Sequence, residues 1–342
     1  MIKIGIIGQG FIGKMHLATL RKSSLAVVTA VADREPSNLE GKAVAGNIDV
    51  AGDISLEGVA RYEDGDALLR DPNVEAVLIA LPTYMHKEYI LKAAGAGKHI
   101  LCEKPLTLSS AEGRDVLEAL NGYDRVFMSA QCIRFWPVYV EARKYVLGGV
   151  YGNLLSAQFT RQSCKPTWSW QNWLLDDTKS GGALLDLHIH DVDYVNCLLG
   201  TPDQVNAIGC DMPGEGVSQV NACFRYANGP VVAVDGGWMH PADFPFRMGF
   251  RMEFEQAAVE FDSRIDGNLH VYPAGGGHLT PELLPGDGYS REHEYFLRCI
   301  LEGKKAEEAS PESAVASVAL VERERACIRS TAGTANSERE RS

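Results

Sequence analysis

Short apolar runs alternate with amphipathic segments over the first 120 residues of the chain. The runs are rich in Ile, Val and Ala, and they occupy residues 3–8, 26–33, 76–81 and 99–102. Segments with helical periodicity accompany them, at residues 12–22, 64–70, 85–94 and 109–120. Continuous apolar runs, without alternation, are typical of strands that are buried on both faces. The pattern therefore predicts a doubly wound parallel sheet over residues 1–122.

The pattern changes after residue 122. A segment at 126–135 leads into a helix at 137–147, and from residue 205 strand-like pieces follow one another without long helices between them. These pieces occupy residues 205–210, 219–226, 231–239, 247–254 and 258–261. They predict an α+β domain over residues 123–330 with an open, mainly antiparallel sheet, closed by helices at 289–301 and 311–329. The small and polar residues 331–342 predict a C-terminal tail.

A glycine-rich loop joins the first predicted strand to the first predicted helix. Its sequence is Gly8-Gln9-Gly10-Phe11-Ile12-Gly13. In this position the first glycine permits a tight turn, the second lets the backbone approach a pyrophosphate, and the third allows close packing of helix on strand. Asp33 ends the second predicted strand, where a carboxylate accepts the hydroxyls of an adenosine ribose. The spacing indicates a Rossmann domain that binds a dinucleotide.

The cofactor expected from these residues is NAD. Asp33 should repel the 2′-phosphate of NADP. Arg34, its neighbour, could instead stack on adenine or pair with that phosphate, so NADP stays open as the second choice.

Composition and charge exclude several other classes of protein. The 342 residues are 45% hydrophobic and contain 33 Lys and Arg against 45 Asp and Glu, a net charge of −12. An acidic chain is poorly suited to neutralise phosphate backbones, so we expect no nucleic-acid partner. No apolar run is long enough to span a bilayer and the first strand leads directly into glycines, so we expect a cytoplasmic protein without membrane contact.

Glu103-Lys104-Pro105, at the end of the fourth predicted strand, completes a set of four recognisable segments. The other three are the glycine loop, ALPTYMH at residues 80–86, and SGGALLDLHIHDVD at residues 180–193. Together they resemble the glucose-fructose oxidoreductase, inositol dehydrogenase and rhizopine-catabolism (Gfo/Idh/MocA) family. Leu81 and Thr83 differ from the residues that are usual in the family, and His188 stands where the family often has glycine.

The resemblance implies roles for several residues. Oxidation of a secondary alcohol by NAD requires a base beside the hydroxyl, and histidine suits this task because its pKa lies near neutrality. By resemblance, His190 accepts the alcohol proton, Asp186 orients the substrate, and Lys104 hydrogen-bonds the reacting oxygen. The cofactor contacts implied beside the glycine loop, Asp33 and Arg34 are Leu81, Pro82, Thr83, His86, Glu103 and Lys104.

Helical periodicity gives independent support for a functional face at residues 184–199. On a regular α-helix, Asp186, His190 and Asp193 fall at i, i+4 and i+7 on one face, opposite an apolar stripe. Such a row indicates the lining of a cleft, although a solvated polar face has the same pattern. His188 points elsewhere, so we interpret it as a packing residue and expect no metal site.

Substrate contacts are expected from two further segments. Gln131 and Arg134 lie where the chain leaves the first domain, and Arg134 fits either a substrate contact or a salt bridge between domains. Trp168, Trp170 and Trp173 precede the glycine-rich segment, and indole faces stack on the C–H faces of sugars. Core packing is the alternative for each tryptophan; of the three, Trp170 is the predicted substrate contact.

Three functions compete. The leading one is an NAD-dependent dehydrogenase or reductase that acts on a secondary hydroxyl of a sugar, sugar derivative or cyclitol. The alternative is cleavage of a glycosidic bond through transient oxidation and elimination, without net redox change. A nucleotide sensor without turnover is the third, and the presence of Lys104, Asp186 and His190 together counts against it. The open sheet predicts a homodimer or homotetramer.

Overall fold

The computed structural model describes residues 1–42 and 54–339. Within them the chain divides into two compact units. The first unit is built from Met1–Phe135, Trp168–Trp173 and Gly286–Val315, and the remaining described residues form the second unit.

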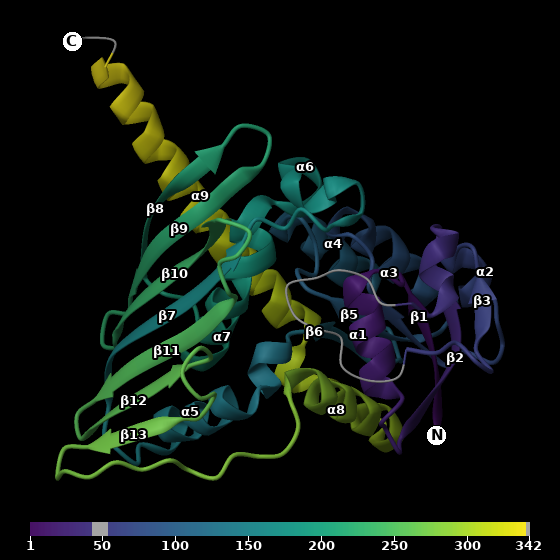
Figure 1. Cartoon of the computed structure of the whole chain (residues 1–342), viewed down its shortest axis with the longest axis horizontal. Coiled ribbons are helices and arrows are strands. Elements are labelled where there is room, and N and C mark those ends of the chain that lie inside the picture. The colour runs from purple at the N-terminus through teal and green to yellow at the C-terminus, as the bar shows by residue number, and fades with distance from the viewer. Residues whose placement is uncertain (43–53, 340–342) are drawn as a thin grey trace. The chain divides into compact units, whose positions relative to one another are not determined.

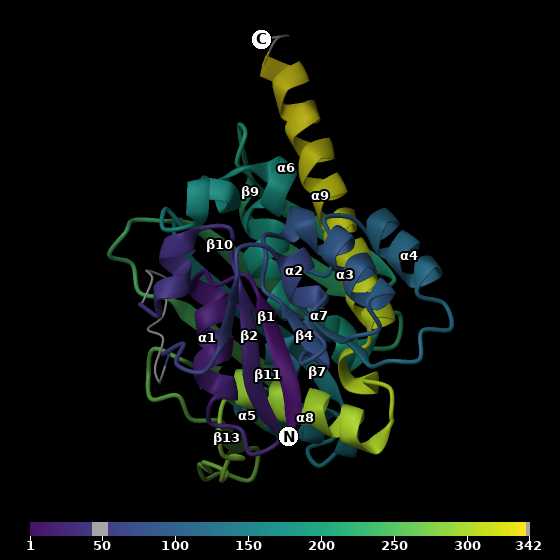
Figure 2. The ribbon, with the colours of Figure 1, turned by 90° about the vertical axis from the view of Figure 1, so that its right-hand side faces the viewer.

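The first unit contains a six-stranded parallel sheet with the strand order β3-β2-β1-β4-β5-β6. Its strands are β1 (Ile2–Ile7), β2 (Ala26–Ala32), β3 (Ala60–Tyr62), β4 (Ala76–Ile79), β5 (His99–Glu103) and β6 (Phe127–Ala130). Strands β1 and β2 run side by side in Figure 2. The predicted doubly wound parallel sheet is confirmed. The prediction omitted β3, because this short edge strand is largely exposed and has no apolar run.

Helices cover both faces of this sheet, as its continuously apolar strands require. They are α1 (Phe11–Leu20), α2 (Gly65–Leu69), α3 (His86–Gly95), α4 (Ser110–Ala119) and α8 (Gly288–Glu302), with the 3-10 helices η1 (Pro36–Glu40), η2 (Thr83–Met85), η3 (Cys132–Phe135) and η6 (Glu307–Ala309). Leu17 of α1 and Phe296 of α8 join one buried cluster with the sheet. Leu68 of α2, Tyr89 of α3 and Val116 of α4 join a second cluster, which covers the other face.

The first unit extends beyond the expected boundary at residue 122. Strand β6 pairs with β5, and the 3-10 helix η3 follows it directly, so the chain leaves this unit only after Phe135. Helix α8 also belongs here, because its apolar face packs with α1 against the sheet. Sequence patterns could not reveal this return, because it depends on contacts between distant segments.

The second unit contains a seven-stranded sheet with the order β13-β12-β11-β7-β10-β9-β8 (Figure 1). Its strands are β7 (Leu154–Cys164), β8 (Gln204–Met212), β9 (Gly216–Arg225), β10 (Val231–His240), β11 (Arg247–Phe254), β12 (Ala257–Asp262) and β13 (His270–Pro273). Only the β7–β10 pairing is parallel, so the predicted mainly antiparallel sheet is confirmed. The prediction omitted the central strand β7, since two of its inward positions are the polar Arg161 and Ser163.

The helices of the second unit include two short ones that were not predicted, α6 (Asp177–Ser180) and the 3-10 helix η4 (Trp170–Leu175), and two others that differ from their predicted form. The remaining helices are α5 (Pro137–Gly148), the π-helix η5 (Leu184–His188), α7 (Ile189–Leu199) and the later part of α9 (Pro311–Arg339), while η4 has residues in both units. The single α-helix expected at residues 184–199 therefore begins as a π-helix. Helix α9 continues to Arg339, beyond its expected end at residue 329, so the tail expected from residue 331 is helical as far as it is described.

No helix within residues 1–42 and 54–339 combines the length and the apolar character that crossing a membrane demands.

Candidate functional site

Four loops of the first unit lie at one edge of its sheet. Because β1, β4, β5 and β6 are parallel, the loops that follow them all leave from their carboxyl ends. The strand order reverses between β1 and β4, since β2 and β3 lie on one side of β1 while β4, β5 and β6 lie on the other. Open α/β sheets bind ligands at such a switch point.

The glycine loop at the end of β1 has the packing that its sequence predicts. Gly8 has a φ of +96°, and a Cβ there would lie 2.3 Å from the carbonyl oxygen of Ala80. A Cβ at Gly13 would lie 1.9 Å from the carbonyl oxygen of Gly8. Gly10 is different, because no described atom lies within 4 Å of a Cβ added to it. Gly8 and Gly13 are therefore needed by the fold itself, whereas Gly10 leaves open space beside the backbone.

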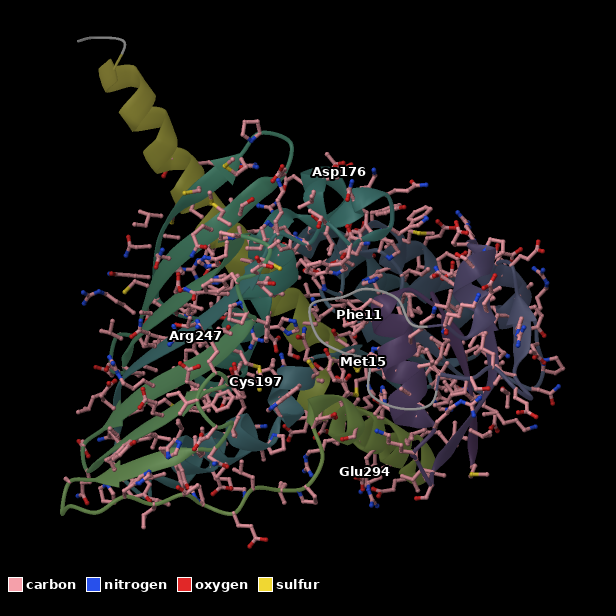
Figure 3. All side chains as sticks on the ribbon, viewed as in Figure 1. Phe11, Met15, Asp176, Cys197, Arg247 and Glu294 are labelled. Atoms are coloured by element: carbon pink, nitrogen blue, oxygen red, sulfur yellow. The ribbon has the colours of Figure 1, made fainter. Side chains whose placement is uncertain are left out.

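Helix α1 starts directly after this loop, with Phe11 as its first residue (Figure 3). The first N–H groups of a helix have no partner within it, and the helix dipole makes this end attractive to phosphate. Phe11 and Ile12, the two loop residues between the second and third glycines, thus supply backbone donors at the position expected of a pyrophosphate site.

Asp33, which follows β2, is held by backbone donors on both sides. Its Oδ2 accepts from the N–H of Gln9 at 2.6 Å, and its Oδ1 accepts from the N–H of Glu35 at 2.8 Å. A carboxylate has about four lone-pair positions, so acceptor capacity remains for hydroxyl groups. The carboxylate is thereby tied to the glycine loop, as a ribose-binding residue requires, while the neighbouring Arg34 is exposed.

His86 connects the loop after β4 with the loop after β5. The ring is buried, with Nδ1 2.8 Å from the carbonyl oxygen of Pro105 and Nε2 2.8 Å from that of Leu81. Burial lowers the pKa of His86, and the two carbonyl groups offset only part of this effect. His86 therefore acts on the site by holding Leu81, Pro82 and the turn at Pro105 in place.

Four buried polar groups near this edge have no hydrogen-bond partner within the described ranges. They are the Oε1 of Gln9, just after β1, the hydroxyl of Thr83, just after β4, the hydroxyl of Ser129 in β6, and the Nε2 of Gln131, just after β6. Unsatisfied buried polar groups are costly, and a bound ligand is one way to satisfy them. The edge therefore fits a polar ligand such as the nicotinamide ribose or a polyol.

Glu103 and Lys104 occupy the carboxyl end of β5. Glu103 is buried; its Oε1 lies 2.7 Å from Nε2 of His16, and its Oε2 accepts from the backbone N–H of Lys104 at 2.9 Å. Burial raises the pKa of Glu103, but the hydrogen bond from His16 and other interactions, among them that with the charged Lys104, lower it by more, so its pKa lies below the usual value. The charged Glu103 thus anchors the backbone at Lys104, whose side chain is partly exposed.

The second unit carries the other two expected catalytic residues. Asp186 lies in the π-helix η5 and His190 in the first turn of α7, and both are partly exposed while most of their neighbours are buried. Single π-helical turns occur frequently at functional sites. Asp193 is different from the expectation, since it is buried and accepts a hydrogen bond from the Ser317 hydroxyl at 2.8 Å. It is therefore a packing residue.

Buried polar pairs hold η5 and α7 in position. Arg161 of β7 donates two hydrogen bonds of 2.9 Å to the carboxylate of Asp191, the residue after His190. His188 is fully buried, with Nε2 3.3 Å from Oε1 of Glu324, which agrees with the packing role predicted for it. Sequence analysis missed Arg161 and Asp191, because nothing near either residue signals a partner on a distant element.

The remaining expected substrate residues have different environments. Arg134 is buried in the first unit and donates from Nη1 to the carbonyl oxygen of Glu308 and to the Ser313 hydroxyl, both at 2.9 Å. It therefore has a packing role within the first unit, and a substrate contact for it stays a prediction. Trp170 is 46% exposed, so the core-packing alternative does not describe it.

The first unit thus brings the whole expected cofactor set to one sheet edge, together with Lys104 and Gln131. A dinucleotide-binding oxidoreductase of the Rossmann type is the class that this edge defines. Two family profiles then match the chain: "Oxidoreductase family, NAD-binding Rossmann fold" over residues 2–131 and "GFO/IDH/MocA C-terminal domain" over residues 139–258. The chain belongs to the Gfo/Idh/MocA family of NAD-binding oxidoreductases.

Individual relatives have several activities. The 2,7-anhydro-N-acetylneuraminate hydratase of Escherichia coli K12 is 32% identical over 217 residues, which are 63% of this chain and 55% of the hydratase. The D-xylose 1-dehydrogenase (NADP(+)) 2 of Haloferax volcanii is 28% identical over 304 residues, 88% of this chain and 89% of that enzyme. A solved levoglucosan dehydrogenase complex with NADH and levoglucosan has the same fold, with a TM-score of 0.79 at 24% identity, covering 95% of this chain and 97% of that one.

Proposed function

We propose that the protein is an NAD-dependent oxidoreductase that transfers hydride between nicotinamide and a secondary hydroxyl of a sugar, sugar derivative or cyclitol. One observation carries the proposal above all others. Lys104, a partly exposed cation, follows β5 at the same sheet edge as the glycine loop and Asp33, and buried Glu103 anchors its backbone. An ammonium group beside a dinucleotide site suits a reaction in which negative charge develops on a substrate oxygen.

Bound NAD supplies the hydride acceptor, and the chain supplies the proton chemistry and the orientation. Lys104 donates a hydrogen bond to the reacting oxygen and stabilises the charge that develops there. His190 takes the hydroxyl proton and returns it in the reverse direction, while Asp186 orients the substrate and supports the imidazolium. This assignment requires Lys104, Asp186 and His190 to reach the same hydroxyl group when substrate is bound.

The ordered surroundings of His190 support its role. A general base must be held in one orientation, and the buried Arg161–Asp191 pair fixes the helix at the residue next to His190. Asp186 and His190 are both partly exposed, unlike most of their neighbours in η5 and α7.

The preferred cofactor in this proposal is NAD. Two backbone amides hold the Asp33 carboxylate, so it cannot easily turn away from a 2′-phosphate. We expect wild-type protein to bind NAD more tightly than NADP, and Asp33→Asn to narrow that difference by about 10-fold, a change of about 1.4 kcal/mol. Fluorescence titrations with NADH and NADPH measure both affinities. If the ratio of the NADH and NADPH affinities is the same in the variant as in the wild type, Asp33 does not contribute to the preference for NAD.

A polyol substrate is supported by the chemistry of the edge and by the exposed indole of Trp170. The unsatisfied groups of Thr83, Ser129 and Gln131 are suited to hydroxyl groups. The test is a screen of sugars, uronic acids and inositols with NAD and NADP, followed through the absorbance of the reduced nicotinamide. We expect reduction with at least one polyol, and failure across the whole screen would argue against net oxidation.

The second candidate function is cleavage or hydration of a sugar without net redox change. The observation that favours it is the 32% identity with the Escherichia coli hydratase. The two functions differ in what happens to the electrons. If a sugar substrate disappears and reduced nicotinamide accumulates stoichiometrically, the dehydrogenase proposal holds; loss of substrate without accumulation favours the second function.

We also propose that the protein forms a homodimer or homotetramer through the open sheet of the second unit. The sheet is open, because its edge strands β8 and β13 lie at opposite ends of the strand order. Exposed apolar side chains such as Ile208 and Met239 lie on it. Light scattering at micromolar concentration tests the proposal, and a monomer would contradict it.

A further inference from the structure

The first unit contains a cluster of buried ionisable side chains that the proposed reaction does not use. His16 lies in α1, and Glu292 and His293 lie in α8; all three are at most 2% exposed. One nitrogen or oxygen atom from each lies within 4.8 Å of the corresponding atoms of the other two. In Figure 3, Met15 marks the α1 side and Glu294 the α8 side of this helix pair. The cluster thus joins two helices that are distant in sequence.

The hydrogen bonds of His16 orient one of its nitrogens towards the cluster. Its Nε2 lies 2.7 Å from the Oε1 of Glu103, and a carboxylate accepts, so Nε2 carries the proton. The unprotonated Nδ1 then lies 2.8 Å from Nε2 of His293. A histidine that donates one ring N–H to a carboxylate and presents its other nitrogen is the usual arrangement of a metal-binding histidine.

Three atoms of the cluster have no hydrogen-bond partner within residues 1–42 and 54–339. They are the two carboxyl oxygens of Glu292 and Nδ1 of His293. A buried carboxylate without a counter-charge is strongly disfavoured, and a protonated one still has a hydroxyl donor to satisfy. A bound cation removes both difficulties, and a doubly charged one also balances the second buried carboxylate, Glu103.

We propose that His16, Glu292 and His293 bind a divalent transition-metal ion, with zinc as the best match, and that the ion clamps α8 onto α1. Two imidazoles and one carboxylate are ligands that zinc accepts readily, whereas magnesium and calcium prefer oxygen ligands alone. This proposal departs from the expectation of a metal-free protein. Sequence analysis considered only the histidines at 188 and 190 as a metal pair.

Binding requires a small adjustment. Two nitrogens of a tetrahedral zinc site with bonds of about 2.0 Å lie about 3.3 Å apart, so the rings of His16 and His293 must separate by about half an ångström. When Nε2 of His293 becomes a ligand, its proton resides on Nδ1, and the ring stays neutral. Glu292 binds as the carboxylate, and any proton that it carried leaves to solvent.

The metal content of the full-length, untagged protein tests the proposal without any activity assay. We expect about one zinc per chain by elemental analysis after incubation with zinc chloride and gel filtration. The variants Glu292→Gln and His293→Ala should retain less than about a tenth of the wild-type zinc content. Glu294→Gln is the matched control, because Glu294 lies on the same helix but is exposed and paired with Arg298. Equal zinc in all four proteins, or none in the wild type, would overturn the proposal.

Cobalt binding to the wild type provides a readout that does not depend on the folding of cluster variants. Cobalt(II) bound by imidazole and carboxylate in a four-coordinate site has a strong visible absorption, which zinc should abolish by displacement. His278→Ala separates this site from the exposed His270–His278 pair. We expect the absorption to persist in His278→Ala, and its loss there would place the ion at the surface pair and contradict the proposal.

The zinc measurement is independent of the proposed enzyme. If the chain binds zinc but reduces no nicotinamide, the metal site is supported and the dehydrogenase proposal is contradicted. If the chain is active but binds no zinc, the dehydrogenase proposal is supported and the metal site is contradicted.

Discussion

Buried polar groups are satisfied to different degrees in two regions of the molecule. Around α7 in the second unit two carboxylates are paired: Arg161 donates two hydrogen bonds to Asp191, and Ser317 donates one to Asp193. At the sheet edge and in the helix pair of the first unit, Thr83, Gln131 and Glu292 have buried polar atoms without a partner among the described residues. Matched groups stabilise a rigid support, whereas unmatched groups indicate where a ligand is needed.

The largest effect on stability is expected from breaking a matched pair. Arg161→Leu leaves the carboxylate of Asp191 buried without a counter-charge, which should cost about 3–5 kcal/mol of unfolding free energy. Urea unfolding measures this loss. Arg247→Leu on the same sheet is the control, because the Arg247–Asp262 pair is partly exposed and should cost at most about 1 kcal/mol. Similar losses in the two variants would show that burial does not set the strength of the pair.

Substitutions of two glycines in the phosphate loop should have separate effects, one on folding and the other on cofactor binding. Gly13→Ala places a Cβ 1.9 Å from the Gly8 carbonyl oxygen, so the strain should cost about 1–3 kcal/mol of stability. Gly10→Ala meets no described atom within 4 Å and should leave stability nearly unchanged while weakening NADH binding. Thermal melts and NADH titrations of both variants test this. Full affinity in Gly10→Ala would mean that no phosphate approaches that backbone.

The hydroxyl of Ser317 should affect stability alone. Ser317→Ala removes a hydrogen bond from buried Asp193 and should destabilise the protein by about 1–3 kcal/mol, without changing the affinity for NADH. Denaturant unfolding and the same titration are the measurements. A weakened cofactor affinity at unchanged stability would reverse the assignment of Asp193 to packing.

The smallest expected change in stability concerns Thr83, and it is the one change that is not a loss. Thr83→Val replaces an unsatisfied buried hydroxyl by a methyl group of similar shape, so the stability of the ligand-free protein should stay equal or rise slightly. Binding of cofactor or substrate should weaken instead. Melting temperatures with and without NADH show both effects, and a clear loss of stability without ligand would mean that the hydroxyl already has a partner.

The first unit was predictable because its signals are local. Continuous apolar runs located β1, β2, β4 and β5, and the glycine loop with Asp33 located the cofactor edge. The second unit was less predictable, because the inward Arg161 of β7 hides the alternation of a strand. The π-helical turn at Asp186 also departs from the regular helix that periodicity assumes.

Residues that depend on distant partners could not be found in the sequence. His16 and His293 are 277 positions apart, and neither belongs to a motif that names the other. The same is true of Arg134, whose position suggested a substrate or a salt bridge but whose Nη1 donates to a carbonyl and a hydroxyl group. Burial and hydrogen-bond partners, and not residue type, separated ligand-binding candidates from packing residues.

Hydride transfer by paired variants tests the central claim most directly. NADH binding and nicotinamide reduction would be measured for the wild type, Lys104→Ala and His190→Ala with the best substrate of the polyol screen. The account predicts that His190→Ala binds NADH like the wild type, that Lys104→Ala still binds it, and that both variants reduce nicotinamide about 10²–10⁴-fold more slowly. Wild-type turnover in either variant would contradict it.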